Sequence, residues 1–163
     1  MRIGFKLNGQ AQDVDVHPGE SLLELLRRSG AVSVKNGCSN GDCGSCAVLL
    51  DGRAVTSCLL FAGQVDGHEL MTTEGLATTE GLHPLQQGLL ETGGVQCGFC
   101  TPGILMTAVD LFSRAADPTD EDIRHALAGN LCRCTGYVKI VEGVQAAAAL
   151  LRTPAEPLEA DDV

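Results

Sequence analysis

Eight cysteines, which fall into two groups of four, constrain this chain more than any other feature of its sequence. The first group lies in the N-terminal half and comprises Cys38, Cys43, Cys46 and Cys58. The second group lies in the C-terminal half and comprises Cys97, Cys100, Cys132 and Cys134. The N-terminus lacks the apolar stretch of an export signal, and thiols stay reduced in the cytosol, so disulfides explain these cysteines poorly. Two metal sites, one in each half, are the better interpretation.

The first group has the spacing Cys38-x4-Cys43-x2-Cys46, with Cys58 further along the chain. This is the spacing of plant-type 2Fe–2S ferredoxins. A loop that encloses a cluster needs backbone that approaches it closely, and Gly37, Gly41 and Gly44 supply conformations and close approach that other residues cannot. Loop amides can then donate hydrogen bonds to the cluster sulfurs. A zinc ribbon fits less well, because it favours paired Cys-x2-Cys units.

The second group combines Cys97-x2-Cys100 with Cys132-x-Cys134. Cys100 directly precedes Thr101–Pro102, which has the pattern of an N-cap followed by proline at the first helical position, so the helix dipole should favour a thiolate at Cys100. Residues two apart do not share a helix face, so Cys132 and Cys134 are expected in a turn between helices. By spacing alone, this quartet could hold a 2Fe–2S cluster or structural zinc, and a thiol redox pair is a third interpretation.

The N-terminal half is predicted to be mostly β-structure. Strands are expected at Arg2–Leu7, Gln12–Val16, Cys46–Leu50, Ala54–Cys58 and near His68–Met71. The turn signals Asn8–Gly9 and Asp51–Gly52 join consecutive strands into hairpins. Ser21-Leu-Leu-Glu24 fits a capping box that opens a short leucine-rich helix ending near Gly30.

The C-terminal half is predicted to be helical. Apolar residues at helical spacing mark segments that contain Leu82–Leu89, Ile104–Phe112 and Tyr137–Leu151, and Thr119 caps a further helix with an acidic first turn. The repeated segment Thr72–Leu82 is interpreted as a linker. These patterns predict an α+β chain with domains at 1–75 and 76–152, followed by an acidic and disordered tail at 153–163.

The charge of the chain excludes some classes of partner. Its formal net charge is −10, and it has no cluster of lysine or arginine, which argues against binding to nucleic acid or to an anionic membrane surface. No apolar run approaches the length of a transmembrane helix. The four histidines are scattered without ligand spacing, so surface or turn roles are expected for them. A cytoplasmic protein is predicted.

Three motifs, taken in order, carry a family resemblance. They are GCSNGDCGSC at 37–46, QCGFCTPG at 96–103 and GNLCRCTGY at 129–137. With them, the chain strongly resembles the iron–sulfur (small) subunit of the xanthine oxidase family of molybdenum hydroxylases. The resemblance covers residues 1 to about 151, so that only the acidic tail falls outside it.

The resemblance implies a β-grasp ferredoxin-like domain followed by an all-α four-helix domain, with one 2Fe–2S cluster held by each cysteine quartet. It also implies that Gln96 and Cys134 contact the pterin of a molybdenum cofactor. In this family a large subunit binds molybdopterin and hydroxylates the substrate, and a medium subunit or domain binds FAD. Electrons pass from the molybdenum centre through the helical-domain cluster and the ferredoxin-type cluster to FAD.

Because the chain has no dinucleotide-binding or Walker motif, molybdopterin and FAD are expected on partner subunits. The resemblance then implies an electron-transfer subunit with no catalytic residue of its own, in a heterotrimer or a dimer of heterotrimers. The alternative is a freestanding carrier, in which a ferredoxin-like domain is joined to a zinc-stabilised docking domain. Without the resemblance, Gln96 would be interpreted as a loop residue that caps the following helix.

Overall fold

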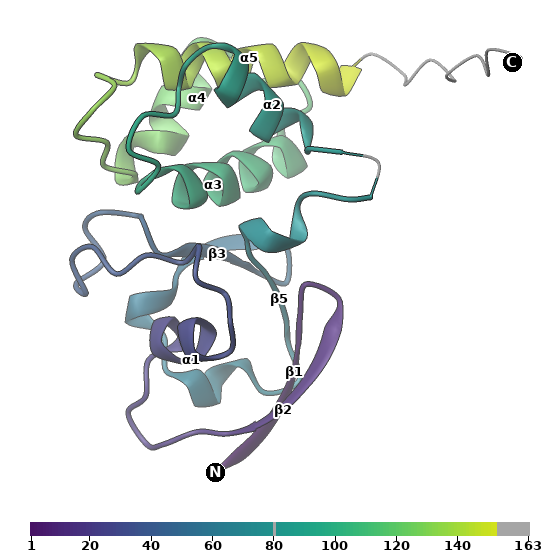
Figure 1. Cartoon of the computed structure of the whole chain (residues 1–163), viewed down its shortest axis with the longest axis vertical. Helices are drawn as coiled ribbons and strands as arrows, with labels where there is room; N and C mark the ends of the chain where they lie inside the picture. The colour runs from purple at the N-terminus through teal and green to yellow at the C-terminus, as the bar shows by residue number, and fades with distance from the viewer. Residues whose placement is uncertain (80, 153–163) are drawn as a thin grey trace, which may run out of the picture.

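A mixed five-stranded sheet forms the core of the N-terminal half (Figure 1). Its strands are β1 (Arg2–Leu7), β2 (Gln10–Asp15), β3 (Ala47–Leu50), β4 (Arg53–Thr56) and β5 (Glu69–Met71). The order across the sheet is β2-β1-β5-β3-β4, in which β1 and β5 are parallel and the other neighbours are antiparallel. The computed structural model describes residues 1–79 and 81–152, and the predicted acidic tail lies outside them.

The first hairpin follows the sequence pattern closely. Ile3, Phe5 and Leu7 alternate along β1 with exposed residues and are buried in the core. The turn at Asn8–Gly9 places both residues in the left-handed region, with φ values of 51° and 78°. Asn and Gly tolerate this conformation, so the twist of the turn matches that of the strands. The predicted hairpin is therefore confirmed.

Helix α1 (Leu22–Arg28) packs against the sheet and completes the β-grasp arrangement (Figure 1). The predicted capping box is present: the Ser21 hydroxyl accepts from the Glu24 amide, and the Glu24 carboxylate accepts from the Ser21 amide. The four leucines of α1 are buried in the N-terminal core. A short sequence signal thus fixes the start of the helix, and its apolar residues fix which side faces the sheet.

Four α-helices form the described part of the C-terminal half, as predicted. They are α2 (Pro84–Glu91), α3 (Thr101–Arg114), α4 (Asp120–Ala126) and α5 (Val138–Arg152). Thr119 caps α4 through the expected side-chain bond to the Asp122 amide. A side chain at Gly88 would collide with the Gly143 carbonyl, so these glycines let α2 and α5 pack closely. None of the helices within the described residues is long and apolar enough to cross a membrane.

Two helix starts differ from the prediction. Helix α3 begins at Thr101, and its N-cap is Cys100, so Thr101 is the first helical residue rather than the cap. Helix α5 begins at Val138, because Tyr137 has φ of 70°, which lies outside the right-handed helical region. In both cases the displaced residue borders a cysteine segment whose conformation overrides the local helix pattern.

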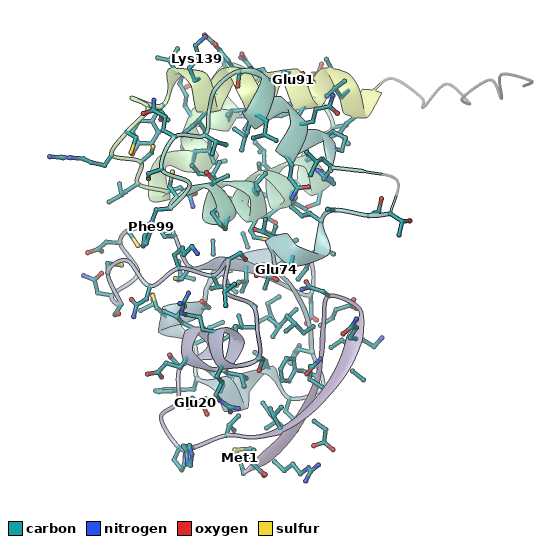
Figure 2. The ribbon with its side chains drawn as sticks, in the orientation of Figure 1. Met1, Glu20, Glu74, Glu91, Phe99 and Lys139 are labelled. Carbon is teal, nitrogen blue, oxygen red and sulfur yellow. The ribbon has the colours of Figure 1, made fainter. Side chains whose placement is uncertain are left out.

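The segment between the two halves is ordered over most of its described length. The short 3-10 helix η3 (Thr73–Gly75) lies between the sheet and α3, where Figure 2 labels Glu74. The Glu74 carboxylate accepts hydrogen bonds from Ser33 and from the Thr72 hydroxyl. Burial acts to raise the pKa of Glu74, but these hydrogen bonds outweigh it and the pKa is lowered. A division of the chain into domains after residue 75 stays a prediction.

Strand β3 joins the two halves because its residues alternate between two cores. Val48 points into the N-terminal core, whereas Ala47 and Leu49 belong to the helical core together with Ile104 and Leu105 of α3. Arg53 of β4 adds a polar contact, since its Nε lies 2.8 Å from Oδ1 of the nearly buried Asp110 on α3. Helix α3 is therefore held against the sheet by apolar packing and an ion pair (Figure 1).

Candidate metal centres

The N-terminal quartet is built from one glycine-rich loop and one short turn. All eight cysteines of the chain are free thiols. Within the loop, the Cys43 amide donates to Sγ of Cys38 at 3.4 Å, and the Cys46 thiol lies within hydrogen-bonding reach of Cys58. Cys58 stands on the 3-10 turn η1 (Ser57–Leu59), directly after β4, so the prediction that β4 continues to Cys58 was wrong by two residues.

The environments of these thiols differ in a way that suits ligands. Backbone N–H groups of Asn40 and Cys43 donate to Cys38 and lower its pKa to about 7. Burial raises the pKa of Cys58 to about 11, and the neighbouring Cys46 thiol acts in the same direction. A thiol that coordinates a metal is deprotonated outright. Metal binding would therefore overcome the cost of forming a thiolate at the buried Cys58, and it would reinforce the tendency of Cys38 to lose its proton.

Two glycines of the loop serve the close approach that the sequence predicted. Gly41 has φ of 88°, a conformation that residues with a side chain rarely adopt. Gly37 has no positive φ, but a side chain there would lie 2.7 Å from Sγ of Cys43. Gly41 therefore allows the turn of the loop, and the absence of a side chain at Gly37 leaves room for the Cys43 thiol.

The C-terminal quartet also consists of two neighbouring pairs. Cys97 and Cys134 are exposed and lie within hydrogen-bonding reach of each other. Cys100 is buried and approaches the partly buried Cys132 in the same way. As predicted, Cys132 and Cys134 lie in a non-helical turn, between the 3-10 helix η4 (Leu127–Gly129) and α5. The fold thus brings together two segments that are more than thirty residues apart in the sequence.

Two residues that the sequence reasoning missed shape this turn. The Tyr137 hydroxyl accepts a hydrogen bond from the Cys132 amide at 2.9 Å, and the Tyr137 amide donates to Oγ1 of Thr135. Oγ1 of Thr135 lies 3.1 Å from Sγ of Cys132. Tyr137 was interpreted as part of an apolar helix stripe, but its φ is left-handed, and the Gly136 before it was the one sequence signal that favoured a turn.

Burial dominates the electrostatics of Cys100, contrary to the sequence expectation. Its position at the N-terminus of α3 favours a thiolate. However, burial and the neighbouring Cys132 thiol raise the pKa of Cys100 to about 12. Burial also acts to raise the pKa of Cys132, but hydrogen bonds from Thr135 outweigh it and the pKa is lowered. The dipole alone therefore does not create a reactive thiolate at Cys100.

The donor sets fit binuclear iron–sulfur clusters. Each quartet offers four thiols arranged as two pairs, and a 2Fe–2S cluster takes four thiolates, two at each iron. Among the described residues, no group of three or more His, Cys, Asp or Glu side chains is arranged to hold a single metal ion. Sulfur-only ligation of this kind suits iron–sulfur chemistry.

The two cysteine segments touch each other. The Leu131 amide, directly before Cys132, donates to the Cys43 carbonyl at 2.9 Å. Phe99, between Cys97 and Cys100, lies against the loop that carries Gly37, and Figure 2 shows it at the boundary between the two halves. The two cysteine-bearing segments are therefore neighbours joined by a backbone hydrogen bond.

Gln96 is exposed beside Cys97. Within the described residues its side chain has no hydrogen-bond partner, and α3 is capped by Cys100 without a side-chain bond. Gln96 therefore does not cap the helix, which was its interpretation in the absence of a family resemblance. Its amide stays available for a ligand or a partner.

Comparison with known protein families assigns a cofactor type to each half. Residues 5–77 match the model of the 2Fe-2S iron-sulfur cluster binding domain, and residues 72–145 match that of the [2Fe-2S] binding domain. The chain therefore has two 2Fe–2S-binding domains, and the zinc alternative for the helical half is not supported.

Relatives of known name decide the family. The chain is 49% identical over 144 residues to the nicotinate dehydrogenase small FeS subunit of Eubacterium barkeri, covering 88% of this chain and 92% of the relative. It is 46% identical to the xanthine dehydrogenase iron-sulfur-binding subunit of Escherichia coli O157:H7, covering 85% and 88% of the two chains. The chain belongs to the xanthine oxidase family of molybdenum hydroxylases, among its iron–sulfur subunits.

Solved structures of the family share the fold. The structure of quinoline 2-oxidoreductase from Pseudomonas putida 86 superposes with a TM-score of 0.90 at 39% identity, covering 93% of this chain and 96% of that chain. Aldehyde oxidoreductase from Desulfovibrio gigas superposes with a TM-score of 0.88 at 41% identity, but the match covers only 17% of that longer chain. The predicted α+β class, with a β-grasp unit and a four-helix unit, is thus confirmed.

Proposed function

We propose that this chain is the electron-transfer subunit of a heteromeric molybdenum hydroxylase. In this proposal it carries electrons from a molybdopterin centre on a large subunit, through its two 2Fe–2S clusters, to FAD on a medium subunit. The observation that carries the proposal is the backbone contact between the two cysteine-bearing segments, in a chain whose relatives are named as iron–sulfur subunits of dehydrogenases. The substrate is converted on the large subunit, and this chain contributes no catalytic residue.

We assign one quartet to each cluster. The ferredoxin-type cluster would be held by Cys38, Cys43, Cys46 and Cys58. The helical cluster would be held by Cys97, Cys100, Cys132 and Cys134. When bound, each cluster supplies a site that accepts and releases one electron. The chain's own contribution is to hold the two sites at a fixed separation and in a fixed order.

The hydrogen bond between Leu131 and Cys43 supports a short route between the clusters. Cys43 belongs to one quartet, and Leu131 is bonded covalently to Cys132 of the other. A single backbone hydrogen bond and one covalent step along the chain therefore connect the ligand Cys43 with the ligand Cys132, without an intervening side chain. Apolar packing of α3 on β3 keeps the two halves from separating at this point.

The surface around the helical quartet supports docking of the large subunit. In a chain with net charge −10, the segments 93–109 and 127–138 contain no acidic residue, and Arg133 is their only lysine or arginine. Phe99, Leu131 and Val138 are exposed there beside the exposed Cys97. Exposed apolar side chains around a redox site are typical of a protein interface. We place the pterin contacts of Gln96 and Cys134 on this surface.

The metal content and the partners test the proposal together. Anaerobically purified protein should contain about four irons and about four sulfides per chain, as two binuclear clusters require. The chain expressed from its native operon should co-purify with a molybdopterin-binding subunit and an FAD-binding subunit, as a heterotrimer or its dimer. A cytoplasmic location stays a prediction. A stable chain without partners, holding about two irons and one zinc, would contradict the proposal.

Replacing Gln96 with alanine should slow the reduction of the clusters by substrate without affecting their reduction by dithionite. Loss of one hydrogen bond to the pterin costs about 1 kcal/mol, which corresponds to a roughly fivefold slower rate. Stopped-flow reduction of the assembled enzyme measures both rates. Gln87→Ala on the exposed side of α2 is the matched control, and it should leave both rates unchanged. Equal rates of substrate reduction in Gln96→Ala and the parent would exclude the pterin contact.

A further inference from the structure

Asn130 is a buried polar residue at the contact between the two halves. Only 4% of it is exposed, although asparagine usually lies at protein surfaces. Its Nδ2 donates to the Gly44 carbonyl at 3.1 Å, in a buried hydrogen bond that spans 86 positions of the sequence. Gly44 lies between Cys43 and Cys46, whereas Asn130 lies two residues before Cys132. One side chain thus connects the two cysteine segments.

The Gly44 carbonyl has little freedom to move. It also accepts from the Ala47 amide at 3.1 Å, so both of its lone pairs are engaged. A side chain at Gly103, in the first turn of α3, would collide with this carbonyl. A side chain at Gly44 would collide with the Gly129 carbonyl and come within 2.6 Å of the side-chain Nδ2 of Asn130. The carbonyl therefore lies between α3 on one side and Asn130 on the other.

Asn130 and Leu131 hold two successive carbonyls of the N-terminal loop. The Asn130 side chain binds that of Gly44, and the Leu131 amide binds that of Cys43. In a trans peptide the N–H points away from the C=O, and no cis peptide occurs among the described residues. Fixing these carbonyls also fixes the direction of the Gly44 and Ser45 N–H groups. Those donors belong to the loop between two cysteines of the N-terminal quartet.

We propose that Asn130 is a positioning residue that sets the potential of the ferredoxin-type cluster from the helical half of the chain. This rests on the proposed function, because it assumes that the N-terminal quartet holds that cluster. Hydrogen bonds to cluster sulfurs stabilise the more negative, reduced cluster and raise its potential. Without the Asn130 donor, the Gly44 carbonyl keeps only one of its two hydrogen bonds, so the peptide that carries the Ser45 N–H is held less firmly and hydrogen bonds from the loop to the cluster weaken. The potential of this cluster then falls, and its coupling to the helical cluster weakens.

The test is a redox titration followed by EPR of the full chain carrying both clusters, in its complex. Asn130→Ala and Asn130→Leu both remove the donor without adding a charge, and the second keeps a branched side chain in the buried position. Both should shift the potential of the ferredoxin-type cluster to more negative values. Both should also reduce the spin–spin splitting between the two reduced clusters. The potential of the helical cluster should move less. Asn130→Ser keeps a shorter donor, and it should restore part of the shift.

Arg53→Gln is the matched control, because it breaks a different contact between the halves, away from the loop. This variant should leave the potential of the ferredoxin-type cluster unchanged. Equal shifts in Arg53→Gln and Asn130→Leu would overturn the proposal, since they would reflect domain orientation alone. Unchanged potentials in both Asn130→Ala and Asn130→Leu, with both EPR signals present, would also overturn it and leave the proposed function standing. Absence of two 2Fe–2S signals from the parent would instead contradict the proposed function itself.

Discussion

Replacing Cys43 with alanine should remove the ferredoxin-type cluster and leave the helical cluster in place. Each quartet is confined to its own half, and Cys43 contributes no thiol to the C-terminal group. The variant should therefore retain about two of four irons and one of the two EPR signals. In the assembled enzyme, substrate should still reduce the helical cluster, but electrons should no longer reach FAD. Iron analysis, EPR and the rate of flavin reduction measure these outcomes.

The reciprocal variant provides the control for this experiment. Cys100→Ala should remove the helical cluster and retain the ferredoxin-type signal, so that the two variants lose different signals. Because Cys100 is buried in the helical core, this variant should also unfold at a lower temperature than Cys43→Ala. Loss of both signals from a folded Cys43→Ala protein would contradict the assignment of one quartet to each half.

Local features of the fold could be predicted from the sequence because the interactions that form them join residues only a few positions apart. The capping boxes at Ser21 and Thr119 satisfy backbone donors three residues away, so the pattern and the structure agree. The turn at Asn8–Gly9 requires left-handed conformations that these two residue types adopt readily. The cysteine spacings and their motifs likewise predicted the two cluster domains, which the family models confirm.

Contacts between the halves could not be predicted, because no local pattern encodes a partner far away in the sequence. Asn130 stood out in the sequence only as a member of the motif at 129–137, yet its side chain donates to the Gly44 carbonyl. The chain conformation at Tyr137 overrode an apolar periodicity that favoured helix. At Cys100, the helix dipole was recognisable in the sequence, but burial depends on the tertiary packing and has the larger effect. These residues all lie in or next to the cysteine segments, where the backbone conformation that brings the cysteines together differs from that of a regular helix.

The contact between α3 and the N-terminal loop should be sensitive to added volume. A side chain at Gly103 would meet backbone atoms of Gly44 and Ser45, which cannot rotate away as a flexible side chain could. Gly103→Ala should therefore lower the free energy of unfolding by about 1–3 kcal/mol, the usual cost of overpacking. For a chain of this size, the melting temperature should fall by roughly 2–4 °C for each kcal/mol.

Gly129→Ala is the matched control, because a side chain there meets no atom within 4 Å and Gly129 has no positive φ. It should melt close to the parent, as thermal unfolding followed by circular dichroism would show. If α3 moves away from Gly44 to accommodate the methyl group of Gly103→Ala, the link between Leu131 and Cys43 should lengthen as well. Flavin reduction should then slow in Gly103→Ala but not in Gly129→Ala. A Gly103→Ala protein with the melting temperature of the parent would show that the contact between α3 and Gly44 tolerates displacement. If its flavin-reduction rate also equals that of the parent, the close approach of the Cys43 and Leu131 segments does not set the rate of electron transfer.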